Sequence, residues 1–276
     1  GVQTCALPIF AVSALFVALF ILRETKAREP IMPPMLWKHP FIAVSNAASL
    51  TTGIVLMGIS AFLPTYVQGV MGLAPTAAGF TLATMSIGWP LASTFGGRIM
   101  HRTGFRPMAV AGGVVLVAGS CVFLLLGKWP SPWLAAAGSF LIGVGMGLST
   151  TTFLVGVQSS VGWEHRGAAT ASNMFMRSLG TSVGTAFLGG ILNAGLTAHF
   201  RKHQAQLPDY TLDLDVTNQL LDPELRAAIP AAALDVIRTG LSGAMGTVYL
   251  VVAGMSALSL LFILVLPRKR QAEDAA

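Results

Sequence analysis

One stretch of this sequence combines an apolar composition with a basic side chain that could act inside a membrane. Residues 168–194 read AATASNMFMRSLGTSVGTAFLGGILNA and are long and apolar enough to cross a bilayer, yet they contain Arg177. A guanidinium group at membrane depth is costly, so it needs a partner, a watery cavity or a route to the surface. Helical spacings of three, four and seven place further residues on the face of Arg177, namely Asn173, Gly180, Thr181 and Gly184.

Two interpretations of Arg177 stay open. In the first, its face is turned into a helix bundle, and Arg177, Asn173 and Thr181 belong to a polar cavity or gating network. The opposite face then meets lipid or apolar neighbours through Phe175, Leu179, Ser182 and Ala186. In the second, Arg177 snorkels: it lies about 14 Å from the start of the span at about 1.5 Å per residue, so its side chain can reach the surface.

The composition is that of an integral membrane protein. The chain has 276 residues, of which 54% are hydrophobic and only 10% are charged, whereas soluble domains carry about 25% charged residues. The net charge of +6 comes largely from basic residues at the ends of apolar spans, so it predicts no nucleic-acid partner. Cys5 and Cys121 form neither a metal-binding spacing nor a disulfide framework, and we expect no metal and no cofactor.

The apolar segments predict an all-α fold. A bilayer core of about 30 Å needs about 20 apolar residues as helix, and six segments satisfy this, approximately 41–68, 76–97, 108–127, 132–157, 168–194 and 240–266. The remaining chain divides into a truncated membrane helix at 10–22, a proline-rich linker at 23–40, a long outer loop at 195–239 and a tail at 267–276. Within the outer loop, Asp222-Pro223-Glu224 predicts the start of a short surface helix, over 223–228 or 231–238.

The first nine residues do not match the helical run that follows them, and the chain has no initiator Met. We therefore set residues 1–9 aside as a non-native start and expect a fragment whose N-terminal part is missing.

The distribution of Lys and Arg predicts the orientation in the membrane. One side of the predicted spans carries eleven of these residues: Arg23, Lys26, Arg28, Lys38, Arg98, Arg102, Arg106, Arg166, Arg268, Lys269 and Arg270. The other side carries fewer, most of them in the long loop, which also holds six acidic residues. We expect the eleven-charge side, and with it the C-terminus, to be cytoplasmic in a bacterial inner (plasma) membrane.

The loop after the second span carries a recognisable motif. It reads GGRIMHRTGFRP, which gives Gly97-x-x-x-His101-Arg102-x-Gly104-x-Arg106. This spacing resembles the cytoplasmic loop motif of the major facilitator superfamily, Gly-x-x-x-Asp-Arg-x-Gly-Arg-Arg/Lys. His101 and Phe105 depart from that pattern. The resemblance therefore implies motif roles for Gly97, Arg102, Gly104 and Arg106, while the carboxylate role in gating does not carry over to position 101.

A second resemblance covers the chain from about residue 10 to its end. Phe62-Leu63-Pro64-x-Tyr66-x-Gln68, Gly72-Leu73-x-Pro75-x-x-Ala78-Gly79 and Phe175-x-Arg177-x-Leu179-Gly180-x-x-x-Gly184 are similar to the fourteen-span drug:proton antiporters of that superfamily. The resemblance implies a six-helix C-terminal bundle of 3+3 inverted repeats, 41–127 and 132–266, plus the end of one preceding helix. It also implies a cavity partly lined by the first full span, which makes Asn46 and Gln68 candidate pathway residues.

The resemblance further implies the function and the partners. These are proton-coupled efflux of lipophilic drugs or toxic compounds, with the lipid bilayer, a small lipophilic substrate, protons and the missing N-terminal half as partners. Since no predicted span contains Asp or Glu, a proton-carrying carboxylate would have to lie in that missing half.

Two alternatives remain open at this point. One is a facilitator or symporter for sugars or metabolites, and the other is a membrane scaffold that begins near residue 10 and transports nothing. An enzyme is not expected, because the sequence contains no metalloprotease, phosphate-loop or nucleophile-elbow motif and its five histidines lie in predicted loops. The glycines at 143, 145 and 147, and those at 180 and 184, predict close helix packing.

Overall fold

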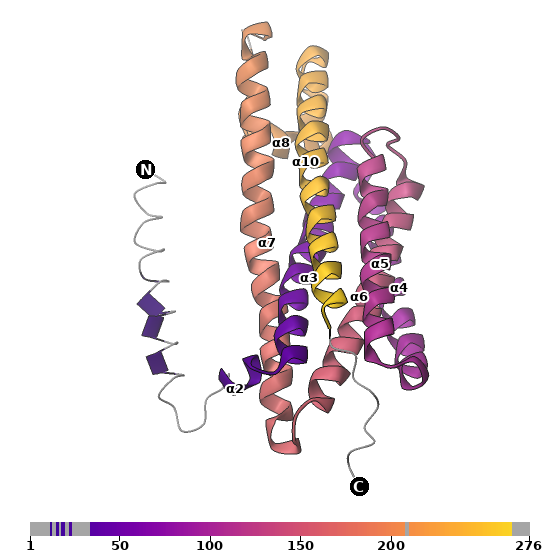
Figure 1. Ribbon diagram of the computed structural model, residues 1–276. Helices are drawn as coiled ribbons and strands as arrows, with labels where there is room; N and C mark the ends of the chain where they lie inside the picture. The colour runs from indigo at the N-terminus through magenta and orange to yellow at the C-terminus, as the bar shows by residue number, and fades with distance from the viewer. Residues whose placement is uncertain are drawn as a thin grey trace.

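The computed structural model describes residues 34–207 and 210–266, together with Val12, Leu15, Phe16, Ala18, Leu19, Leu22 and Arg23. The described part is a bundle of long helices (Figure 1). Its elements in chain order are α2 Pro34–Trp37, α3 Pro40–Thr65, the π-helical turn η1 Tyr66–Val70, α4 Pro75–Thr103, α5 Phe105–Leu125, α6 Pro132–Ser159, η2 Trp163–His165, α7 Arg166–His203, η3 Gln204–Gln206, α8 Asp215–Leu221, α9 Pro223–Ala227 and α10 Ala231–Leu264. The predictions for residues 1–9, for most of 10–33 and for the tail 267–276 lie outside the described residues.

Proline and glycine mark several ends of these helices. Pro40, Pro75 and Pro132 each occupy the first turn of a long helix, where the missing N–H costs no hydrogen bond and the fixed φ suits the helix. Gly104 separates α4 from α5 with φ of 87° and Gly72 follows η1 with φ of 69°. Both lie in a region that side chains with a Cβ rarely adopt.

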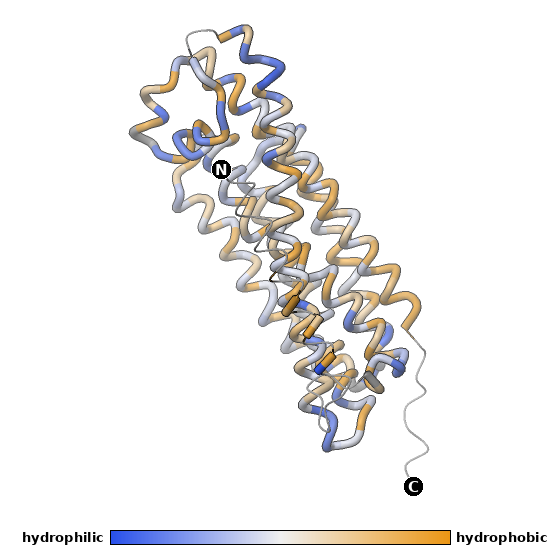
Figure 2. The backbone as a smooth tube through the Cα atoms, turned by 90° about the vertical axis from the view of Figure 1, so that its left-hand side faces the viewer, coloured by the Kyte–Doolittle hydropathy of each residue, from blue (hydrophilic) through white to orange (hydrophobic). Residues whose placement is uncertain are grey.

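Five of the described helical segments are long and apolar enough to cross a membrane: Pro40–Val70, Phe105–Leu125, Pro132–Ser159, Trp163–Gln206 and Ala231–Leu264. The sixth predicted span, 76–97, lies within α4. That helix has 29 residues, but its Ser, Thr, Gly and Arg content makes it less apolar than the other five. The prediction of six apolar spans therefore holds for five of them by this criterion, and α4 supplies a sixth helix of sufficient length. Figure 2 shows hydrophobic colouring along the long helices and hydrophilic stretches at the two ends of the bundle.

The predicted outer loop, 195–239, is helical at both of its ends. α7 runs on to His203 and α10 begins at Ala231. The buried stripe Leu188, Leu192, Leu196 and Phe200 repeats every four residues, so the helix keeps a packed face beyond position 194. With 38 residues, α7 is about 57 Å long at about 1.5 Å per residue, well beyond the ~30 Å of a bilayer core. α7 and α10 accordingly extend past the other long helices at the end where α8 lies (Figure 1).

Two glycines bring α3 and α7 into backbone contact. A Cβ atom on Gly53 of α3 would clash with the carbonyl oxygen of Arg177, and a Cβ atom on Gly180 of α7 would clash with the carbonyl oxygen of Leu50. Gly53 thus faces the carbonyl of the residue three positions before Gly180. In the same way, Gly180 faces the carbonyl of the residue three positions before Gly53. Small residues allow this approach, as the sequence predicts for Gly180.

The same relationship recurs between α4 and α6. A Cβ atom on Gly143 of α6 would clash with the carbonyl oxygen of Met85, and one on Gly88 of α4 would clash with the carbonyl oxygen of Phe140. Again each glycine faces the carbonyl three residues before the partner glycine. The bundle therefore contains two glycine crossings of identical spacing, one between α3 and α7 and one between α4 and α6.

α10 closes the bundle against three of the other long helices. α10 packs on α3, α5 and α7, and Ser120 of α5 shares a buried hydrogen bond of 2.7 Å with Ser256 of α10. Near the end of α3 the buried Tyr66 donates a hydrogen bond of 2.8 Å to the Leu126 carbonyl. Its ring packs edge-on against Tyr249, with centroids 5.7 Å apart. These contacts hold η1 against α5 and α10.

Candidate functional site

Four polar side chains form a buried cluster between α3 and α7. Asn46 and Ser49 come from α3, and Ser172 and Asn173 come from α7; we call them the asparagine cluster. The Nδ2 atom of Asn46 donates to Ser172 Oγ at 2.9 Å. The Nδ2 atom of Asn173 donates to Asn46 Oδ1 at 3.2 Å and to Ser49 Oγ at 2.8 Å. The cluster therefore joins the two helices through three side-chain hydrogen bonds.

The burial of the cluster defines what it can do. Asn46 is 0% exposed and Asn173 is 6% exposed, so in this conformation neither amide faces an open cavity. Inside a bilayer an unpaired amide would lack water as an alternative partner, which favours such interhelical bonds. The cluster connects α3 to α7 directly. The glycine crossing at Gly53 and Gly180 lies further along the same two helices.

Arg177 lies one helical turn beyond Asn173 and reaches a third helix. Its side chain is half-buried, and Nη1 donates to Oγ1 of Thr150 on α6 at 3.4 Å, which is a long hydrogen bond. Its own carbonyl oxygen belongs to the crossing with Gly53. Position 177 thus touches both α3 and α6, and it does so within a helix that is otherwise free of charge over 168–194.

The two faces of α7 differ in burial as their helical spacing predicts. Asn173, Gly180 and Gly184 are buried, whereas Phe175 and Leu179 are exposed. Thr181 is half-buried, but its hydroxyl donates to the Ser178 carbonyl of the same helix at 2.7 Å. Thr181 therefore shares the face of Arg177 without joining the asparagine cluster.

Gln68 does not join these residues. It lies in η1 at the far end of α3, and its side-chain amide donates to the Pro64 carbonyl at 3.3 Å. Since 22 positions separate it from Asn46, the two residues are about 33 Å apart along a helix. Asn46 and Gln68 therefore lie toward opposite ends of the segment Pro40–Val70.

The loop motif between α4 and α5 connects to the end of α10. Arg106 Nη2 donates to the Leu264 carbonyl at 2.9 Å, and Leu264 is the last residue of α10. A cation at a helix C-terminus satisfies a free carbonyl and complements the helix dipole. Arg102 is exposed, and a Cβ atom at Gly97 would meet nothing within 4 Å. Of the four motif residues, Arg106 and the φ-positive Gly104 therefore have identifiable structural roles here.

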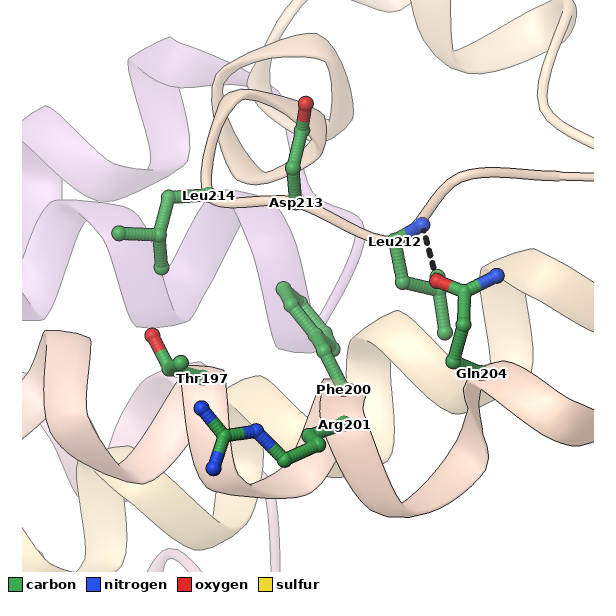
Figure 3. A pocket seen from close by; sticks show the side chains of 7 residues that line it. All are labelled: Thr197, Phe200, Arg201, Gln204, Leu212, Asp213 and Leu214. Atoms are coloured by element: carbon green, nitrogen blue, oxygen red, sulfur yellow. Dashed lines mark hydrogen bonds between the residues drawn. The ribbon is translucent and has the colours of Figure 1, made fainter.

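A separate hollow lies where α7 leaves the bundle. It measures about 510 Å³ and is lined by Thr197, Phe200, Arg201, Gln204, Leu212, Asp213 and Leu214. Gln204 organises the chain beside it: its Nε2 atom donates to the carbonyls of Leu207 and Tyr210, and its Oε1 atom accepts from the Leu212 amide at 2.8 Å (Figure 3). The Asp213 side chain points away from Phe200 and Arg201 in this view. The Gln204 side chain thus holds the segment after α7 in place beside the hollow.

Sequence reasoning missed two members of the asparagine cluster. Ser49 and Ser172 were not singled out, although Ser49 lies three residues after Asn46 and Ser172 directly precedes Asn173. The available signal was a serine close to an asparagine on the same helix. This signal does not show which other helix the serine and the asparagine will face.

Comparison with known proteins identifies the family. The family model described as Major Facilitator Superfamily matches residues 4–185, more than half of the chain. The chain belongs to the major facilitator superfamily. This membership confirms the resemblance drawn from the motifs and assigns the chain to a family of transporters rather than enzymes.

Individual superfamily members with curated descriptions resemble this chain over about two thirds of its length. The multidrug transporter protein MdtP of Bacillus subtilis is 30% identical over 188 residues, which are 68% of this chain and 35% of that protein. Multidrug resistance protein 3 of Bacillus subtilis is 28% identical over 186 residues, which are 66% of this chain and 36% of that protein. The chain thus spans little more than a third of the length of these two relatives.

The fold is also that of the superfamily. The structure of a bacterial homolog of the human lysosomal transporter Spinster, in an inward-facing and unoccupied conformation, aligns with a TM-score of 0.65 and 15% identity. The alignment covers 87% of this chain and 51% of that one. The chain therefore has an all-α membrane fold and matches about half of that structure.

Proposed function

We propose that this chain is the C-terminal half of a carrier that exports small lipophilic compounds across a bacterial inner membrane, with proton coupling. The observation that carries the proposal is the similarity to multidrug transporters and multidrug resistance proteins along 66–71% of the chain. The matched part of each of these relatives is 35–37% of its length, which supports a further helical half as the partner of this bundle.

We assign the bundle to two three-helix repeats, α3–α4–α5 and α6–α7–α10. The two glycine crossings support this assignment. If α3 corresponds to α6 and α4 to α7, then Gly53 corresponds to Gly143 and Gly180 to Gly88, and both crossings have the same glycine-to-carbonyl spacing. Inverted repeats of this kind are common in secondary transporters, whose substrate sites lie near the bilayer midplane. The substrate cavity would then lie between this half and the other one.

Within this scheme the position of Arg177 is distinctive. Its counterpart in the other crossing is Met85, which also gives its carbonyl to a glycine contact. The α3–α7 crossing therefore carries a cationic side chain that the α4–α6 crossing lacks. The hydrogen bond to Thr150 directs this side chain toward α6. We infer that Arg177 acts in substrate passage or in gating. The asparagine cluster, one helical turn before Arg177, holds α7 against α3.

Proton coupling is proposed for the complete carrier rather than for this bundle alone. Within the six spans predicted from the sequence, all of which lie in the described part of the chain, Arg177 is the one charged residue and there is no Asp or Glu. We place the proton-binding carboxylate in the other half. The basic end of the bundle, with Arg98, Arg102 and Arg106, would face the cytoplasm together with the C-terminus.

The test is transport by the complete protein in proteoliposomes. A lipophilic fluorescent dye is followed across the membrane with an imposed proton gradient, and again after a protonophore has dissipated the gradient. Gradient-dependent dye movement supports the proposal. Movement of a sugar or metabolite that does not respond to the protonophore would favour a facilitator instead, and failure to move any compound, with the protein correctly inserted, would favour a scaffold.

A further inference from the structure

Two arginines converge on one glycine at the end of the bundle opposite the Gly104 turn. Gly72 follows η1, Arg226 lies in α9 and Arg238 lies in α10. A Cβ atom at Gly72 would lie 3.2 Å from Nη2 of Arg238 and 3.8 Å from Nη1 of Arg226. Three segments that are far apart in the sequence therefore meet at this turn.

The two guanidinium groups meet without a counterion in the described chain. Their nearest nitrogens lie within about 7 Å of each other, the sum of the two distances, and like charges at this separation repel. Both side chains are half-buried. Neither forms an ion pair with any described carboxylate, and Nε of Arg238 is buried with no hydrogen-bond partner. A buried donor on a charged group is costly to leave unpaired.

The backbone adds positive potential at the same turn. The Gly72 amide donates no backbone hydrogen bond in the described chain. Three residues later α4 begins at Pro75 and continues for 29 residues, so the positive end of its helix dipole lies next to the turn. Gly72 itself has φ of 69° and no side chain, and a Cβ atom there would press against Nη2 of Arg238.

We propose that Arg226, Arg238 and the Gly72 turn bind a phosphate-type oxyanion. Arginine suits this role because its planar fork of N–H donors matches phosphate oxygens. An oxyanion between the two guanidinium groups would offset their repulsion and give Nε of Arg238 an acceptor. The same chemistry is offered by two sources, the phosphate of an anionic phospholipid headgroup at this membrane surface and free inorganic phosphate.

The experiment uses the full chain in nanodiscs of phosphatidylcholine. Thermal unfolding is followed by tryptophan fluorescence while inorganic phosphate replaces chloride at constant ionic strength. A second series adds phosphatidylglycerol to the nanodiscs without phosphate, and native mass spectrometry counts the retained lipid. The variants are Arg226→Gln, Arg238→Gln and the double variant. Arg201→Gln is the matched control, because Arg201 is an exposed arginine at the same end of the bundle.

We expect one of the two probes to raise the unfolding temperature of the wild-type protein and of Arg201→Gln. In the double variant the apparent affinity for that probe should fall about tenfold or more, because two charge-assisted contacts are lost. Without any anion the double variant should unfold at the wild-type temperature or above it. If the double variant does not fold, the same loss of affinity is sought in Arg226→Gln alone.

The two probes separate the sources of the anion. A shift with phosphate identifies a free oxyanion, and a shift with phosphatidylglycerol alone identifies a lipid headgroup; either supports the site. The proposal is overturned if neither probe stabilises the wild-type protein, if the shift survives in the double variant, or if Arg201→Gln loses it to the same extent.

Discussion

The side-chain amides of Asn46 and Asn173, 127 residues apart in the sequence, share a buried hydrogen bond of 3.2 Å between α3 and α7. Ser49 and Ser172 complete the polar contact on either side of it. This link and the glycine crossing that follows fix the position of α7, and therefore the position from which Arg177 extends toward α6.

Replacing Asn173 with Leu should destabilise the bundle. The change removes the donor to Asn46 Oδ1 and Ser49 Oγ and leaves both acceptors buried, which we expect to cost about 1–3 kcal/mol. The free energy of unfolding in detergent micelles is the measurement. Asn193→Leu is the matched control on the same helix, since Asn193 is exposed, and it should change stability little. Equal effects of the two variants would argue against the cluster as a link between helices.

Substitution at the glycine crossing should be more damaging than the loss of a hydrogen bond. A Cβ atom on Gly180 would clash with the Leu50 backbone, which cannot move as a flexible side chain could. Overpacking of this kind costs about 1–3 kcal/mol or more, so Gly180→Ala should unfold at a lower temperature. Gly190→Ala provides the comparison: nothing lies within 4 Å of a Cβ there, and alanine should stabilise the helix by up to about 1 kcal/mol. A neutral Gly180→Ala would mean that α3 and α7 separate readily.

Removal of the Arg177 charge should abolish transport by the complete protein and leave membrane insertion intact. Arg177→Ala removes both the cation and the contact with Thr150, while Arg177→Lys keeps the charge without the planar fork. Dye transport in proteoliposomes is the measurement, with the amount of inserted protein as the internal control. Full transport by Arg177→Ala would instead favour a snorkelling side chain.

Loss of the Arg106 side chain should loosen the end of α10. Arg106→Gln removes the cation from the Leu264 carbonyl, and a helix C-terminal cation of this type contributes about 0.3–1 kcal/mol. Hydrogen exchange of the amides in the last turn of α10 should become faster, with little change in α4. Arg102→Gln is the control, because Arg102 is an exposed arginine of the same motif. Equal exchange in both variants would exclude a capping role for Arg106.

The local features of this protein were predictable from its sequence because they depend on neighbouring residues. Apolar length located the spans, Asp222-Pro223-Glu224 marked the start of α9, and helical spacing placed Asn173, Gly180 and Gly184 on one buried face of α7. Composition predicted the wrong end for α7, because the average polarity of the segment concealed a narrow apolar stripe. Residues 195–203 are polar enough to suggest a loop, yet Leu196 and Phe200 continue the packed face of α7.

Only the tertiary structure decided which faces meet. The pairing of Asn46 with Asn173, the contact of Arg177 with Thr150 and the convergence of Arg226 and Arg238 on Gly72 join segments that lie far apart in the chain. Helical periodicity defines a face but not its partner, because the partner depends on how whole helices pack as rigid bodies.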